Sequence, residues 1–189
     1  MCIRDRPTDV DRDVAAEESR VARLTGADEE VVVVDKLRKT YPGGKHAVRG
    51  ISFGIPIGEV FGFLGVNGAG KTSTLKILSG DIVPTEGQAR LAGYDVLREQ
   101  VQCRRLLGYC PQFDALLELL TVREHLELFA KIKNVPADEI EAVVADKVKE
   151  MDLSEYVDVR AGALSGGNKR KLSVAIALIG DPPIVFLDE

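Results

Sequence analysis

The 189-residue chain has no tryptophan, few aromatic side chains and only three cysteines. Cys2, Cys103 and Cys110 are odd in number and follow no metal-binding spacing, so they argue against a disulfide scaffold and favour free thiols in a reducing compartment. No stretch approaches the roughly 20 apolar residues that a membrane-spanning helix needs, and the N-terminus lacks the apolar run of a secretory signal. We therefore expect this polypeptide by itself to be soluble, with any membrane role supplied by parts outside it.

The chain also lacks a basic excess. It has 25 basic and 30 acidic side chains, and the imbalance is concentrated in residues 1–30, which have nine acids and five bases. Because a basic stripe is the usual footprint of a nucleic-acid binder, we expect no nucleic-acid partner. Residues 1–30 are also poor in aromatics and show no sustained periodicity, which predicts a disordered leader or linker there.

From Val31 onward the pattern is that of an α/β domain, and residues 31–189 form the predicted folded region. A β-branched run at 31–34 and a strand-like stretch at 51–57 flank a turn at 41–44. The apolar run at 60–64 predicts a buried strand, and a glycine-rich turn then leads into a helix over 71–79, with Gly80 as its C-cap. A strand, a glycine loop and a helix in that order begin a β-α unit of a parallel sheet.

The middle of the chain is predicted to be helical. Thr121 and Glu124 form a capping-box pattern before an apolar stripe, and a second amphipathic helix is expected over 137–151. These helices indicate a helical subdomain, over about residues 113–165, inserted into the α/β core. A third helix is expected over 168–179, and the apolar run 184–187 suits a central parallel strand.

The segment GVNGAGKT, residues 65–72, fits the phosphate-binding P-loop pattern G-x-x-x-x-G-K-[ST]. Its glycines let the backbone wrap a phosphate chain, while the N–H groups at the helix start favour anionic charge. In such a loop Lys71 reaches the terminal phosphates and Thr72 offers its hydroxyl to Mg²⁺. The alternative is a plain glycine turn before a helix, which the flanking strand and helix patterns disfavour.

Two further segments point to nucleotide chemistry. Asp188 and Glu189 follow an apolar strand, where one carboxylate can hold Mg²⁺ and its neighbour can deprotonate an attacking water; a solvated loop start is the alternative. The segment LSGG, residues 164–167, places a serine and two glycines at a helix start and so creates a second anion-binding N-terminus. Because two helix starts do not readily converge on one phosphate, the second suggests a phosphate supplied by a partner.

Together, these segments and Gln112 within YCPQFD resemble the nucleotide-binding domain of ATP-binding cassette (ABC) transporters. The wording GYCPQFDALLELLTVREHLELFAKIKNVP looks most like subfamily A, the full-length transporters associated with lipid movement. The resemblance covers residues 31–189. It implies a P-loop NTPase core of the RecA-like α/β class, with an N-terminal antiparallel β portion and an inserted α-helical subdomain.

The resemblance also assigns roles to matching positions. Tyr41 would stack on adenine, although a turn aromatic beside Pro42 is an equal alternative on sequence alone. The loop that holds ATP would comprise Gly65, Asn67, Gly68, Gly70, Lys71, Thr72 and Ser73. Mg²⁺ would be held by Thr72, Gln112 and Asp188.

For catalysis, the resemblance implies that Glu189 is the general base and that Gln112 senses the attacking water in a loop that touches the membrane domain; a polar residue without that role is the alternative for Gln112. The γ-phosphate held by a second cassette would be capped by Ser165, Gly166 and Gly167 in a head-to-tail dimer. The partners implied are this second cassette and transmembrane domains, at the cytoplasmic face of a membrane.

The sequence departs from the family pattern at its end. His46 and His125, its only histidines, do not match the position of the family's histidine switch, and several C-terminal strands are not represented. We therefore expect a piece of a larger protein. The alternatives are a soluble ABC-type ATPase of chromosome organisation, repair or translation, and a catalytically inert fragment.

Overall fold

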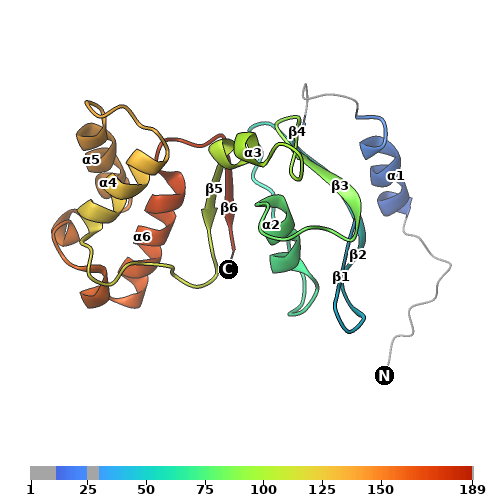
Figure 1. Ribbon diagram of the computed structural model, residues 1–189, viewed down its shortest axis with the longest axis horizontal. Helices are drawn as coiled ribbons and strands as arrows, with labels where there is room; N and C mark the ends of the chain where they lie inside the picture. The colour runs from blue at the N-terminus through green and yellow to red at the C-terminus, as the bar shows by residue number, and fades with distance from the viewer. Residues whose placement is uncertain (1–11, 25–29, 189) are drawn as a thin grey trace. The chain divides into compact units, whose positions relative to one another are not determined.

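The computed structural model describes residues 12–24 and 30–188 (Figure 1). The chain divides into two compact units, Met1–Cys103 and Arg104–Glu189, which we call the N-terminal and C-terminal units. In the parts of the chain that the structure describes, no helix combines the length and apolar character needed to cross a bilayer.

The N-terminal unit is built on a four-stranded antiparallel sheet. Its strands are β1 (Glu30–Tyr41), β2 (Lys45–Pro56), β3 (Glu86–Leu91) and β4 (Tyr94–Asp95), in the order β2-β1-β3-β4. Helices α1 (Arg12–Val21) and α2 (Lys71–Leu78) lie on opposite faces of this sheet (Figure 1). Because both faces are covered, successive residues of β1, Val32, Val33 and Val34, are all buried.

Part of the disordered leader expected over residues 1–30 is helical instead, because α1 spans Arg12–Val21. It docks on the edge strand β2 through charged groups: Glu17 accepts a hydrogen bond from the Gly54 N–H at 2.9 Å, and Arg20 pairs with both Glu17 and the buried Glu30. The Arg20 guanidinium lowers the pKa of Glu17. Residues 1–11 and 25–29 of the expected leader lie outside the described residues.

The buried strand expected at 60–64 is wrong. This segment belongs to neither sheet of the described residues, and Val60 and Leu64 are almost fully exposed. An apolar run becomes a buried parallel strand only when hydrogen-bonded neighbours cover it, and here no described strand pairs with it. Its Phe61 ring instead stacks on Phe53 of β2, with 5.3 Å between centroids.

The C-terminal unit combines a short parallel sheet with helices. Strands β5 (Leu107–Cys110) and β6 (Ile184–Leu187) pair in parallel, with Cys110 opposite Leu187. The helices are α4 (Val122–Ile132), α5 (Ile140–Glu150) and α6 (Gly166–Leu178), and α3 (Gln100–Leu106) spans the border between the two units. Helices α4, α5 and α6 share one core centred on Leu126, Val144 and Leu172.

The predicted helix signals are confirmed. Thr121 is the N-cap of α4, and its side chain and that of Glu124 form a reciprocal capping box. Helix α2 begins at Lys71, and Gly80 follows its end with a left-handed φ of 76°. These local signals position the loops that carry the candidate site.

Candidate functional site

The P-loop is a tight turn that runs directly into helix α2. The Ala69 N–H donates to the Val66 carbonyl at 3.0 Å, and the loop then reaches Gly70, the N-cap of α2. Since glycine has no side chain, no side-chain oxygen caps this helix start. A helix N-terminus without a side-chain cap presents backbone N–H groups and a positive dipole end, which is a favourable environment for phosphate.

Gly70 cannot be replaced without changing the loop. Its φ is 96°, a left-handed value, and an added Cβ would lie 2.2 Å from the Ala47 carbonyl oxygen of β2. The glycine therefore permits the loop to press against the sheet. Gly68 is also left-handed, at φ 84°, but space around its missing side chain is open.

The remaining P-loop side chains gather around this turn. Lys71 Nζ donates to the Gly65 carbonyl at 2.7 Å, so the ammonium group lies over the loop. The Tyr41 hydroxyl lies 3.3 Å from the Ser73 hydroxyl, which places the predicted adenine-stacking ring beside α2. Thr72, in the first turn of the same helix, is half-buried. The N-terminal unit thus brings together the predicted phosphate and adenine residues.

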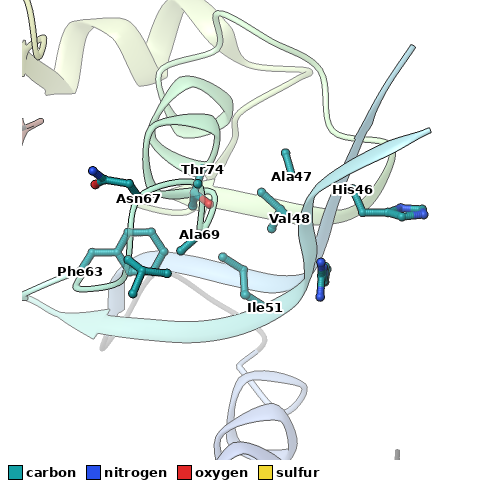
Figure 2. Close-up of a pocket in the computed structure, with 11 residues that line it drawn as sticks. His46, Ala47, Val48, Ile51, Phe63, Asn67, Ala69 and Thr74 are labelled. Atoms are coloured by element: carbon teal, nitrogen blue, oxygen red, sulfur yellow. The ribbon is translucent and has the colours of Figure 1, made fainter. Parts of the chain in front are cut away.

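A pocket opens beside the P-loop (Figure 2). Its volume is about 390 Å³, within the range of small-molecule sites. Strand β2 supplies one wall, including His46, Val48 and Ile51, and the P-loop supplies the other, including Asn67 and Ala69. A ligand held by the loop therefore has room against the apolar surface of β2.

In the C-terminal unit, the predicted metal ligands Asp188 and Gln112, the second of which is also a predicted catalytic residue, follow the ends of the two parallel strands. Asp188 comes directly after β6, is buried, and donates its N–H to the Cys110 carbonyl at 2.9 Å. Gln112 lies two residues beyond the end of β5 and is exposed. Both therefore sit at the carboxyl edge of this sheet, where ligands bind in α/β folds. Glu189 lies outside the described residues.

The LSGG segment begins helix α6 as the sequence predicts. Ser165 is the N-cap, and its hydroxyl accepts a hydrogen bond from the Asn168 N–H at 3.3 Å. Gly166 and Gly167 are exposed, and an added Cβ at either would meet no atom within 4 Å. Packing within this chain therefore does not require glycine at these two positions.

Three polar groups that sequence reasoning missed hold the Gln112 loop in place. The Arg170 guanidinium donates to the carbonyls of Pro111 and Asp188, and Ser173 donates to Asp114 at 2.8 Å. The fully buried His125 accepts a hydrogen bond from the Leu117 N–H at 2.9 Å. One sequence signal was available for Arg170. It belongs to a basic run near the N-terminal end of α6, where positive charge is unfavourable because of the helix dipole, so the basic residues there must be explained by another interaction.

The described residues contain neither a preformed metal cage nor an activated thiol. No group of three or more His, Cys, Asp or Glu side chains in the described ranges could hold a metal ion. The thiols of Cys103 and Cys110 are free and buried, and burial raises the pKa of each, so they stay protonated at neutral pH. The Thr72 hydroxyl and the Asp188 carboxylate are oxygen donors of the kind that Mg²⁺ uses together with substrate phosphates.

The model of the ABC transporter family matches residues 48–189. The chain belongs to this family, which implies ATP binding and confirms the assignment made from the motifs. Solved structures support the fold. A bacterial ABC transporter cassette, MJ0796, solved as a dimer, aligns with a TM-score of 0.76 and 26% identity over 84% of this chain and 73% of its own. CbiO1 from Clostridium perfringens aligns with a TM-score of 0.75 and 27% identity over 86% and 66%.

Among curated proteins, similar relatives belong to subfamily A. The human retinal-specific phospholipid-transporting ATPase ABCA4 is 51% identical over 183 residues, and mouse ATP-binding cassette sub-family A member 7 is 50% identical over 181 residues. These alignments cover 96% and 95% of this chain but 8% of each relative. The chain therefore spans a small part of the length of these transporters.

Proposed function

We propose that this chain is the ATP-binding and ATP-hydrolysing cassette of a transporter that moves phospholipid. The observation that carries the proposal is the P-loop, where Gly70 presses against Ala47 and leaves the start of α2 without a side-chain cap. A phosphate chain is the ligand that fits such a helix start. The lipid substrate is supported by the relatives, which include phospholipid-transporting ATPases.

In the proposed site, each residue has a separate task. The ammonium group of Lys71 and the N–H groups of α2 would hold the phosphates, and Tyr41 would stack on the adenine. Thr72 and Asp188 would supply oxygen ligands to Mg²⁺, which neutralises phosphate charge when it is bound. Gln112 would also contact the metal and orient water.

In hydrolysis, water attacks the γ-phosphorus as the bond to the ADP oxygen breaks, yielding ADP and inorganic phosphate. Glu189 would accept the proton that the attacking water gives up. A carboxylate suits this task because it can act as a general base within hydrogen-bond reach of water.

We propose two partners for the cassette. A second cassette would place its ATP against Ser165, Gly166 and Gly167, where the exposed glycines leave room for a phosphate from outside the chain. Transmembrane domains would contact the loop around Gln112, which exposes the large apolar side chains of Phe113, Leu117 and Leu119. The cassette would then work at the cytoplasmic face of a membrane.

Nucleotide titration of the 189-residue chain tests the binding step. Lys71→Ala removes the phosphate-facing ammonium and should weaken Mg·ATP binding by about tenfold or more, as loss of a charge-assisted hydrogen bond does. Lys76→Ala is the matched control, since Lys76 lies on the same helix and is exposed. Equal affinities for the Lys71→Ala variant and the unmodified chain would contradict the proposed site.

A further inference from the structure

One arginine joins the ends of the two parallel strands. Pro111 directly follows β5 and Asp188 directly follows β6, and the pairing of Cys110 with Leu187 sets these two residues side by side. The two terminal nitrogens of Arg170, from helix α6, donate separately to the carbonyls of Pro111 and Asp188. The guanidinium therefore bridges the strand ends at the point where the chain leaves the sheet.

A carboxylate holds the arginine in this orientation. Asp114 Oδ1 lies 3.5 Å from Arg170 Nη1 and accepts a hydrogen bond from the buried Ser173 hydroxyl at 2.8 Å. Arg170 and Ser173 lie on neighbouring turns of α6, so this helix binds the loop at Pro111 and again at Asp114. Gln112, which the proposed reaction uses, lies between these two contacts.

The chemistry of this bridge requires arginine. Guanidinium presents donors in a fixed planar fork, so one side chain can span two acceptors at a set separation. Lysine has the same charge but concentrates its donors at a single nitrogen, so it cannot hold both carbonyls in the same geometry.

We propose that Arg170 is a positioning residue that fixes Gln112 relative to Asp188. The Pro111 carbonyl belongs to the peptide bond that leads into Gln112, and the Asp188 carbonyl belongs to the proposed Mg²⁺ ligand itself. The inference rests on the proposed ATPase function and deepens it.

The position of Arg170 also links two sites. Ser165, the N-cap of helix α6, would face the ATP of a second cassette, and five residues later Arg170 holds the strand ends that would serve the ATP of its own cassette. A shift of α6 on contact with the second cassette's ATP would move both carbonyls. Arg170 is thus a physical connection between the two ATP sites of a dimer.

Hydrogen exchange in the 189-residue chain tests the bridge without catalysis. Arg170→Lys should raise the amide exchange rate in peptides covering 109–114 and 184–188 by about tenfold. The reason is that the hydrogen bond from the Asp188 N–H to the Cys110 carbonyl lies next to the contact that Arg170 makes with the Asp188 carbonyl. Asp114→Asn removes the charge but not the hydrogen-bond acceptor, and should raise exchange by about threefold. Lys171→Ala is the matched control on the same helix, because its side chain pairs with exposed Asp152 at the surface; it should leave both peptides unchanged.

Hydrolysis by the full-length protein that contains this cassette tests the role. Arg170→Lys should lower kcat by about tenfold to a hundredfold, a loss typical of misplaced reacting groups, with KM for ATP within about twofold. The half-saturating Mg²⁺ concentration should rise about threefold or more, which a mere loss of folded enzyme would not produce. An unchanged Mg²⁺ requirement or unchanged exchange would overturn the inference. Full activity of the Lys71→Ala variant would instead overturn the proposed function.

Discussion

At the scale of single residues, the P-loop depends on the absence of one methyl group. Gly70 and Gly58 both have left-handed φ values, of 96° and 82°. They differ in their surroundings, because a Cβ at Gly70 would meet the Ala47 oxygen at 2.2 Å whereas a Cβ at Gly58 would meet nothing within 4 Å. Comparing substitutions at these two glycines therefore separates the cost of backbone strain from the cost of a close contact.

We expect Gly58→Ala to lower the free energy of unfolding of the N-terminal unit by about 1 kcal/mol, the usual cost of a left-handed non-glycine residue. Gly70→Ala should cost about 1–3 kcal/mol more, since the loop must also move away from β2. Urea denaturation of the two variants and the unmodified chain measures both terms. Equal losses in the two variants would show that the contact with Ala47 does not constrain the loop.

The P-loop residues proposed to hold phosphate could be identified from sequence because they are contiguous and their chemistry is local. Residues 65–72 need only a turn and a helix start, and the structure supplies both. Arg170 and His125 could not be found in this way. Arg170 binds the carbonyl of Pro111, 59 residues away, and His125 binds the N–H of Leu117. Both partners are backbone groups, which any residue type can supply, so the sequence does not indicate them.

At the scale of elements, helices with strong local sequence signals were predicted and a helix with a weak signal was missed. Helices α4 and α5 carry apolar stripes that bury Leu126 and Val144, and their predicted type is confirmed. Helix α1 was missed because only its last residue, Val21, is buried, so its docking through Glu17 and Arg20 leaves no apolar stripe.

The short strand β5 was missed for a different reason. Strand β5 has only four residues and contains Gly108, a residue with low strand propensity. The fold requires glycine there, since an added Cβ would lie 2.0 Å from the Ala177 carbonyl of α6. A close approach between distant segments is a tertiary constraint, which local propensity cannot reveal.

The capping box of α4 gives a prediction at this scale. Thr121→Ala removes the acceptor of the Glu124 N–H and should cost about 1 kcal/mol of stability, as N-cap removal usually does. In the same box the Thr121 backbone N–H donates to the Glu124 carboxylate at 2.7 Å and, with the Thr121 hydroxyl, lowers the pKa of Glu124 below its ordinary value.

The lowered pKa fixes the sign of a pH dependence. A carboxyl group whose pKa is lower in the folded chain stabilises the fold above about pH 4.5, and this contribution is lost as the pH falls through the folded-state pKa. Glu124→Gln keeps an acceptor without the charge, so it should be less stable than the unmodified chain at pH 7 and approach it at pH 3. Urea unfolding at both pH values tests this, and a difference that grows on acidification would contradict it.

At the scale of the whole molecule, the chain has two compact units, and the C-terminal unit has a core of its own. That core is drawn from residues 122–179, whereas Leu37 of β1 is buried in the N-terminal unit. The division has a chemical counterpart, because the proposed phosphate loop belongs to one unit and the proposed catalytic strand ends belong to the other. Each half of the proposed chemistry is thus supported by its own packing.

Because each unit has its own packed core, we expect a core substitution in one unit to reduce amide protection in that unit alone. Leu126 and Leu37 are matched residues, each 0% exposed, one in each unit. Truncating a buried leucine to alanine costs about 2–5 kcal/mol through lost apolar contacts and a residual cavity. Because stability varies locally within a structure, Leu126→Ala should speed amide exchange in residues 104–188 while β1 and β3 keep their protection, and Leu37→Ala should do the reverse. Hydrogen exchange with mass spectrometry measures both patterns in one experiment. If either variant sped exchange equally in both units, the chain would unfold as one cooperative body, and the phosphate loop and catalytic strand ends would share a single stability.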